Sequence, residues 1–475
     1  QGQPVVMNNE TTITLDLPQW DRQTIAGGFE LRDVTSFLQK VKLDLYYQNL
    51  KKDFYNNIYV HNWQGAAIVD VSTDVHTLND QNSFGGVLQT DWSLGDHHLI
   101  VGADFNRDDL DALDDRPGGY SLIKMGNMVM QTPIAASAYS YRAVQDNLGV
   151  FAQDEWTISD DLTATLGIRE TWVTSELKDN GNNPNLPPGR KISDSKPVGN
   201  VGLVYSGFGS VSLRALWSQG YRFPPLNALY FGTVHGSSSA TLPNPDLEPE
   251  TSNSYELGVR FDDGGLSFDI GIFANQAKNY ITTQPIEGGN NQYVNADQAQ
   301  TIGLELGLAY NIPSTGLTPY TTATFLRRKI TNTITASRRN GTSSQVTYST
   351  YDVGQPSLWG RVGIKYEKDF ENSFVFLSDV YMDWAVKSQE YYYDSSFIHD
   401  FNGTGVQSTF DYGFVTDEYP AWTTLNLSLG LKWGTNHRWN ATLGLRNIFD
   451  REYRIATNTI VESGFHIVAG IGFEF

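Results

Sequence analysis

An alternation of apolar and polar residues with a period of two constrains the fold of this chain more than any other feature. In the C-terminal segment 464–475, one face of an extended strand is wholly apolar and carries Phe465, Ile467, Ala469, Ile471, Phe473 and Phe475. The other face is small or polar apart from Val468. Such a strand suits a sheet with lipid on one side and a polar lumen on the other. The pattern predicts an all-β fold, a transmembrane antiparallel β-barrel of the outer membrane.

The same alternation of apolar and polar residues recurs in segments 162–169, 302–308, 425–433 and 439–446. Composition agrees with a barrel. No run of about 18 apolar residues occurs, which excludes a helical membrane protein. The absence of cysteine is compatible with passage through an oxidising periplasm. A formal charge of −20 argues against nucleic acid as a partner, and acidic loops above a membrane explain it more simply.

We count about 18 strand-like segments, joined alternately by short and long connections. The short connections are residues 159–161, 206–209, 262–265, 367–371 and 433–437, where Gly, Asp and Asn supply the positive φ of tight turns. The long connections are approximately residues 59–73, 114–145, 180–195, 226–250, 332–356 and 390–421. Outer-membrane barrels place short turns in the periplasm and long loops outside. A barrel this wide must hold a water channel or a separate plug.

Two longer motifs carry a family resemblance. The first begins with Gly220-Tyr221-Arg222-Phe223-Pro224-Pro225 and closes with Asn244-Pro245-Asp246-Leu247-Glu248-Pro249-Glu250. The second is Leu445-Arg446-Asn447-Ile448-Phe449-Asp450-Arg451-Glu452-Tyr453. Their order and position resemble the TonB-dependent transporters of the bacterial outer membrane, and the likeness extends along the whole chain. In this family Arg222, Phe223, Pro224, Asn244, Pro245, Asp246 and Leu247 would be motif residues.

The resemblance implies a barrel of 22 strands with an N-terminal plug. Residues 1–475 are then expected to be the C-terminal part of a receptor barrel, with the plug and first strands absent from this sequence. The motif-bearing loop would be the seventh external loop. Expected partners are outer-membrane lipid, lipopolysaccharide and, through the plug, the TonB–ExbB–ExbD complex. An autonomous 18-stranded porin is the alternative.

One histidine, His235, lies between the two halves of the first motif. By resemblance to the heme receptors of the family, it is a candidate axial ligand of heme iron, since imidazole nitrogen binds heme iron well. Tyr230 and Phe231 would support the ligand by stacking, and Tyr230 has a hydroxyl that could itself ligate. Heme is therefore expected as a transported ligand, delivered by a hemoprotein or hemophore. A ferric siderophore is the alternative, because both halves of the motif occur in siderophore receptors and Tyr221 and Phe223 depart from the heme-receptor box.

Other charged groups are weaker candidates. The cluster Asp104, Asp108, Asp109, Asp111, Asp114 and Asp115 fails as a calcium loop, because Asp109 stands where glycine is needed. Arg327, Arg328, Arg338 and Arg339 are expected to form an external basic patch that could bind propionates or anionic siderophores. No catalytic motif is present, so the chain is predicted not to be an enzyme. An energised receptor is the favoured class, with a passive porin and a structural anchor as rivals.

Overall fold

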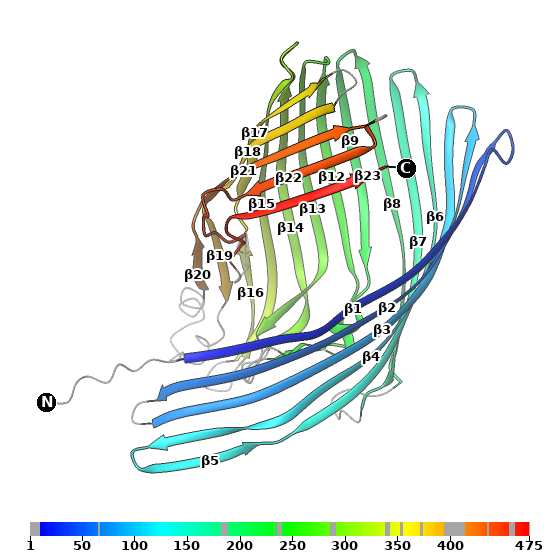
Figure 1. The fold of residues 1–475 in the computed structure, drawn as a ribbon. Coiled ribbons are helices and arrows are strands. Elements are labelled where there is room, and N and C mark those ends of the chain that lie inside the picture. Colours follow the sequence, from blue (N-terminus) through cyan, green and yellow to red (C-terminus); the bar gives the residue numbers. More distant parts are fainter. Residues whose placement is uncertain are drawn as a thin grey trace.

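The computed structural model describes residues 10–64, 67–181, 189–231, 233–234, 240–285, 291–337, 343–351, 355–370, 374–393, 414–434, 437–455 and 461–474. Most of these residues form one sheet of 21 strands, which curves like the wall of a barrel (Figure 1). Among the described residues, no helix is long and apolar enough to cross a membrane.

The wall is an antiparallel meander in which each strand pairs with the next. Its strands are β1 (Glu10–Arg32), β2 (Leu38–Gln64), β3 (Ala67–Leu94), β4 (His97–Met125), β6 (Ser137–Ser159), β7 (Leu162–Asp179), β8 (Lys191–Phe208), β9 (Val211–Arg222), β12 (Glu250–Asp262), β13 (Leu266–Pro285), β14 (Asn291–Tyr310), β15 (Leu317–Ser337), β17 (Leu358–Asp369), β18 (Phe374–Ala385), β21 (Trp422–Trp433), β22 (Trp439–Arg446) and β23 (His466–Phe473). The all-β barrel fold is confirmed, with close to the predicted number of strands. Within the described ranges, no backbone pairing joins β1 to β23.

Smaller elements lie in the connections. β5 (Met128–Ile134) and β16 (Ser343–Tyr351) return alongside β4 and β15 as hairpins. The connection after β9 contains a short π-helix, η1 (Asn227–Phe231), followed by β10 (Thr233–Val234) and β11 (Ala240–Leu242). A separate pair, β19 (Ser388–Tyr393) and β20 (Phe414–Tyr419), lies between β18 and β21 in the chain.

Strand register gives the sheet two chemically different faces, as the alternation predicted. On the outer face, Leu257 of β12 and Ile272 of β13 are direct partners, with 57% and 48% of their surfaces exposed. On the inner face of the same strands, Glu256 and Asp269 bind the guanidinium of Arg214 from β9. The exposed apolar face suits lipid and the polar face suits a lumen.

The short turns lie where the sequence predicted them, and Gly209, Gly264 and Gly434 adopt positive φ there. Three predicted long loops are wrong in their described residues. Segment 59–73 continues as β2 and β3, segment 114–145 continues as β4, β5 and β6, and most of segment 332–356 belongs to β15 and β16.

The physical reason is that polar side chains pair directly across the ladder above the membrane. Asn57 donates to Asp74 (2.6 Å), and His61 lies 2.5 Å from Asp70. At about 3.3 Å per residue, the 28-residue β3 is about 90 Å long, whereas the hydrocarbon core is only about 30 Å thick. Above the membrane, polar residues therefore take the place of the lipid-facing apolar residues, and the sheet continues.

Candidate functional site

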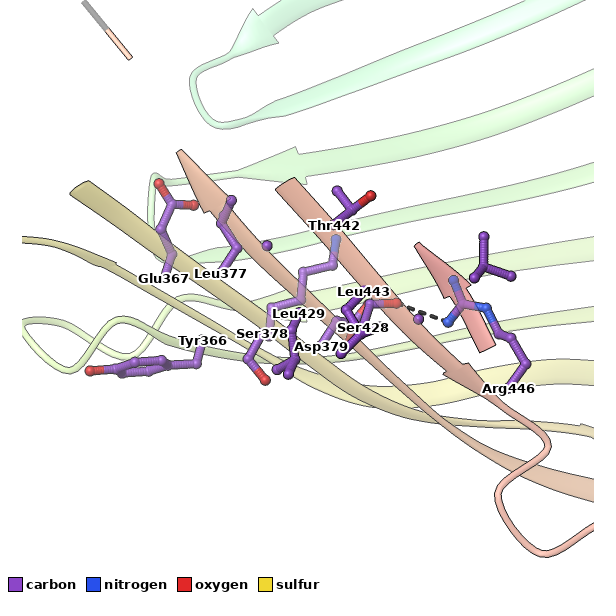
Figure 2. A pocket seen from close by; sticks show the side chains of 14 residues that line it. Tyr366, Glu367, Leu377, Ser378, Asp379, Ser428, Leu429, Thr442, Leu443 and Arg446 are labelled. Carbon is purple, nitrogen blue, oxygen red and sulfur yellow. Dashed lines mark hydrogen bonds between the residues drawn. The ribbon is translucent and has the colours of Figure 1, made fainter. Parts of the chain in front are cut away.

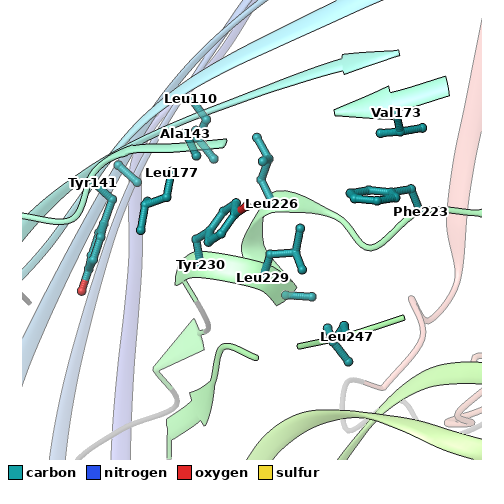
Figure 3. Close-up of a cluster of buried hydrophobic side chains, with 12 residues drawn as sticks. Leu110, Tyr141, Ala143, Val173, Leu177, Phe223, Leu226, Leu229, Tyr230 and Leu247 are labelled. Atoms are coloured by element: carbon teal, nitrogen blue, oxygen red, sulfur yellow. The ribbon is translucent and has the colours of Figure 1, made fainter. Parts of the chain in front are cut away.

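The described parts of the connection between β9 and β12, residues 223–231, 233–234 and 240–249, fold onto the inner face of the barrel wall at its external end. Their apolar residues form a buried cluster with residues of β4, β6 and β7 (Figure 3). The cluster contains Leu110, Ala112, Tyr141, Ala143, Val173, Leu177, Phe223, Leu226, Ala228, Leu229, Tyr230 and Leu247. Val173 and Leu177 lie on the same face of β7 as Arg169, opposite to the lipid-exposed Leu166 and Ile168. The loop is thus packed inside the barrel.

The π-helix η1 supplies the centre of this packing. Leu229 and Tyr230 are fully buried, and Pro224 is among the fully buried side chains. Burial of a side chain of this size contributes about 1.5–3 kcal/mol relative to exposure. These buried side chains anchor the start of the loop against the wall.

Tyr230, predicted as a ligand-supporting residue, therefore lies inside the loop's own core. Burial raises the pKa of its hydroxyl, and the neighbouring Ser175 hydroxyl only partly opposes that shift. Both hydroxyls are buried, and neither has a well-aligned hydrogen-bond partner among the described residues. Tyr230 is therefore a neutral phenol at neutral pH, and direct contact with a ligand would require the loop to move. Phe231 packs edge-to-face on Tyr141, with ring centroids 5.4 Å apart, and keeps part of its surface exposed.

The second half of the motif fastens the end of the loop to β13 and β14. Asn244 donates its side-chain amide to the Tyr293 carbonyl (2.9 Å), and its side-chain oxygen accepts from the Asp246 amide (2.9 Å). Its backbone amide donates to the Ala228 carbonyl (2.8 Å), which joins the two halves of the motif. Asp246 also forms an ion pair with Arg190, from the connection before β8.

The glutamates that follow extend this attachment. Glu248 and Asn295 exchange two hydrogen bonds of 2.8 Å, one from the Glu248 amide and one to its carbonyl. The Glu248 carboxylate accepts from Asn279 (2.8 Å). Glu250 accepts from the Ile281 amide (2.7 Å) and lies 3.5 Å from the mostly exposed Arg222. We call these contacts of Asn244, Asp246, Glu248 and Glu250 the loop clamp.

Between the packed start and the clamped end lies a small hairpin. Thr233 pairs with Thr241 and Val234 with Ala240, while β11 runs parallel to β14 through Thr241 and Asn291. His235, the predicted iron ligand, belongs to the segment 235–239 that joins these two strands and lies outside the described residues. Its role stays a prediction.

The second family motif is also a structural tie. Asn447 is only 2% exposed, and its backbone amide donates to the Asn426 side chain (2.9 Å). Its own side chain donates to the Arg451 carbonyl and accepts from the Arg451 amide. Asp450 accepts from the Phe465 amide (2.8 Å) at the start of the last strand. These bonds hold residues 447–451 against β21 and against the start of β23.

A network of side chains on the inner wall is not visible in the sequence, because it depends on cross-strand register. Four long side chains each lie across a glycine on a middle strand and bond to the strand beyond: Tyr46 over Gly85 to Asn106, Arg169 over Gly149 to Asp104, Arg214 over Gly258 to Asp269, and Tyr320 over Gly363 to Asp379. In each case a β-carbon at the glycine would overlap the crossing side chain. The network therefore needs glycine at these positions.

A shallow pocket lies on the inner wall towards its periplasmic end, across β17, β18, β21 and β22 (Figure 2). Its floor is lined by small residues, including Ser428, Gly430 and Gly444. Arg446 lines one side and donates to the Ser428 hydroxyl (2.9 Å), while Lys365 lies on β17 across the pocket. Above it, the guanidiniums of Arg361 and Arg446 lie 4.0 and 5.5 Å from the centre of the Tyr381 ring. These cation–π contacts stiffen the wall.

The other predicted charged groups are mostly engaged within the sheet. Arg328 donates to the Tyr280 hydroxyl (2.5 Å), and Arg338 and Arg339 lie outside the described residues. Of the acidic cluster, Asp109 binds Arg142, and Asp114 binds Arg116. Among the described residues there is no group of three or more His, Asp or Glu suited to a metal ion.

A two-faced barrel wall with a loop clamped inside its external end defines an outer-membrane β-barrel of the receptor type. The family described as "TonB dependent receptor-like, beta-barrel" matches residues 6–448, and the chain belongs to this family. Its location is therefore the bacterial outer membrane, and its family is one of receptors and transporters rather than enzymes.

Relatives match over shorter stretches. A "Hemin receptor" of Yersinia pestis is 29% identical over 111 residues, which are 20% of this chain and 16% of that protein. An "Iron-regulated outer membrane virulence protein" of Vibrio cholerae is 29% identical over 185 residues, 34% of this chain and 24% of that protein. The matched regions thus span no more than a quarter of these relatives.

Two solved structures share the fold. The "Copper transporter OprC" has a TM-score of 0.67 at 16% identity, over 97% of this chain and 66% of that one. The siderophore receptor PiuA from Acinetobacter baumannii has a TM-score of 0.57 at 14% identity, over 99% of this chain and 78% of that one.

Proposed function

We propose that this barrel belongs to an energised uptake receptor that captures an iron-bearing ligand at loop 223–249, and that the ligand is heme. The observation that carries the proposal is the construction of the loop. Its start is anchored by Leu229 and Tyr230, and its end is held by the loop clamp. The intervening hairpin is thereby presented at the external end of the inner wall, where an incoming ligand must pass.

Heme is favoured over other cargo by the residue type at the tip of this hairpin. The pairing of Val234 with Ala240 leaves His235 as the first residue after β10, and neutral imidazole is a good ligand for heme iron. Gly232 and Gly236 on either side would allow the backbone to approach a flat macrocycle closely. The partly exposed ring of Phe231 would offer an apolar contact next to it. The relative named as a hemin receptor adds independent support.

Uptake would require energy from the TonB–ExbB–ExbD complex, acting on a plug that fills the lumen. The outer membrane has no nucleotide supply of its own, so the ordering and release of a plug would couple the two membranes. A passive porin would instead conduct ions steadily, and an anchoring subunit would co-purify with a stable partner. High ligand affinity without steady conductance is the behaviour expected here.

The test is a hemin titration of the complete receptor in detergent, followed by Soret absorbance. We expect a saturable shift that is weakened or moved in wavelength by His235→Ala. His98→Ala is the matched control, because His98 is an exposed histidine at the opposite, periplasmic end of the barrel. A shift that is the same in both variants would remove His235 as the ligand. No saturable shift in any variant would reject heme and make a ferric siderophore the first candidate.

A further inference from the structure

Three of the five methionines of the chain occur within six residues, Met125 to Met130, at the tip of the hairpin formed by β4 and β5. This hairpin extends far beyond the membrane-spanning part of the wall, at the external end of the sheet (Figure 1). Neither the family motifs nor the proposed capture loop accounts for these residues.

Register places all three side chains on one face. Met125 and Met128 are direct cross-strand partners, and residues that face each other across a ladder point to the same side. Met130 is two residues further along β5, where the period of two returns its side chain to that side. Directly opposite β-carbons lie about 5 Å apart and diagonal ones about 7–8 Å, which flexible thioethers can bridge.

The turn holds this arrangement without help from the methionines. Gly126 adopts φ 59°, and a glycine with positive φ at the first central position is typical of a tight two-residue hairpin. Met125, Met128 and Met130 are 42%, 55% and 49% exposed, so their sulfur atoms are not committed to a hydrophobic core. The backbone is fixed while the donor atoms remain accessible.

We propose that Met125, Met128 and Met130 form a binding site for a soft monovalent cation, Cu(I) or its analogue Ag(I). Thioether sulfur is a soft, neutral ligand that prefers Cu(I) to hard ions such as Mg²⁺ or Ca²⁺. Because thioethers carry no proton, cation binding here displaces none. Affinity at this site is therefore independent of pH, unlike that of histidine or cysteine sites, whose ligands must lose a proton.

The experiment measures Cu(I) binding by the complete receptor in detergent, with ascorbate present and a chromophoric Cu(I) chelator as competitor. The test variant carries Met125→Leu, Met128→Leu and Met130→Leu, which keep the apolar volume of the hairpin and remove only the sulfur atoms. Met382→Leu, on the lipid face of β18, is the matched control. Heat-modifiable gel mobility verifies that each variant is folded.

We expect one Cu(I) per chain in the wild type and in Met382→Leu, with a sulfur shell in the X-ray absorption spectrum. The triple variant should bind at least about tenfold more weakly, and wild-type affinity should be the same at pH 5.5 and pH 7.5. Equal binding by the triple variant, or affinity that falls steeply at the lower pH, would overturn the proposal. Hemin binding is a separate readout, so failure of the copper site leaves the heme proposal untouched.

Discussion

Replacement of Gly258 by alanine is predicted to break the contacts that Arg214 of β9 makes across Gly258 of β12 with Asp269 of β13. We call this arrangement the Arg214 crossing. A β-carbon at Gly258 would lie 2.4 Å from Arg214 Cζ and 2.5 Å from Nε, so the guanidinium must lift away. Arg214 would then lose its two bonds to Asp269, of 2.8 and 3.0 Å, and its 2.8 Å bond to Glu256. All of these partners lie on neighbouring strands, so three strands lose a common tie.

The size of the effect follows from two opposing terms. A hydrogen bond to a charged group contributes about 1.5–3 kcal/mol when well buried, but exposed ion pairs contribute only about 0–1 kcal/mol. With the Arg214 side chain 33% exposed, we take about 1–2 kcal/mol for the whole crossing. Alanine in a strand is itself favoured over glycine by about 0.5–1 kcal/mol. The net loss in the free energy of unfolding should therefore be about 0–1.5 kcal/mol, with the middle of that range at about 0.75 kcal/mol.

The matched control is Gly307→Ala. Gly307 lies on β14 in strand geometry, and nothing lies within 4 Å of the position of its missing β-carbon. Alanine there should stabilise the barrel by about 0.5 kcal/mol or be neutral. Urea unfolding in detergent, followed by tryptophan fluorescence and heat-modifiable gel mobility, gives both values. In an Arg214→Met background, the cost of Gly258→Ala should disappear. If Gly258→Ala is as stable as Gly307→Ala in the wild-type background, the crossing contributes nothing and the reasoning is refuted.

Two further predictions concern loop 223–249. Asn295→Ala removes both bonds to Glu248 and the bond to the Asn279 carbonyl (2.7 Å). Added protease should therefore cleave the loop at least about threefold faster, while the wall stays folded. An unchanged cleavage rate would contradict the loop clamp. The buried Tyr230 has a raised pKa, so its folded form holds its proton at a pH where the unfolded chain, with a tyrosine pKa of about 10, begins to lose it. The contribution of Tyr230 to the packing of the loop should therefore be constant below about pH 10 and weaken above it, and protease cleavage of Tyr230→Phe should lack that change above pH 10.

The alternation of apolar and polar residues along single strands was sufficient to predict the fold. The apolar face of segments such as 302–308 and 425–433 is the lipid-facing side, because lipid imposes its requirement on every second residue. The extracellular extension of β2 to β6 was missed because no lipid imposes that pattern there. In the sequence, residues such as Asn57 and Asp74 look like loop residues. They can be recognised as cross-strand partners only when the register is known.

The inner-wall crossings were missed for a related reason. Gly258 and Arg214 are distant in sequence, and nothing in either segment signals that the arginine lies across the glycine. The proposed methionine site is the opposite case. Its residues are adjacent in sequence and their clustering is visible there, but their placement on one face depends on the two-residue turn at Gly126.

The loop clamp also explains why the first motif is a marker of family rather than of cargo. Asn244 and Glu248 direct their side chains at Tyr293, Asp246 and Asn279, and Leu247 is buried in the cluster with η1. Side chains engaged in this way build the loop. Under the proposed function, selection among ligands would fall to the segment between the two halves, whose flanking strands are positioned by backbone pairing through Thr241. A receptor of this construction could change its cargo by substitution at the tip alone, while the clamp and the wall stay the same.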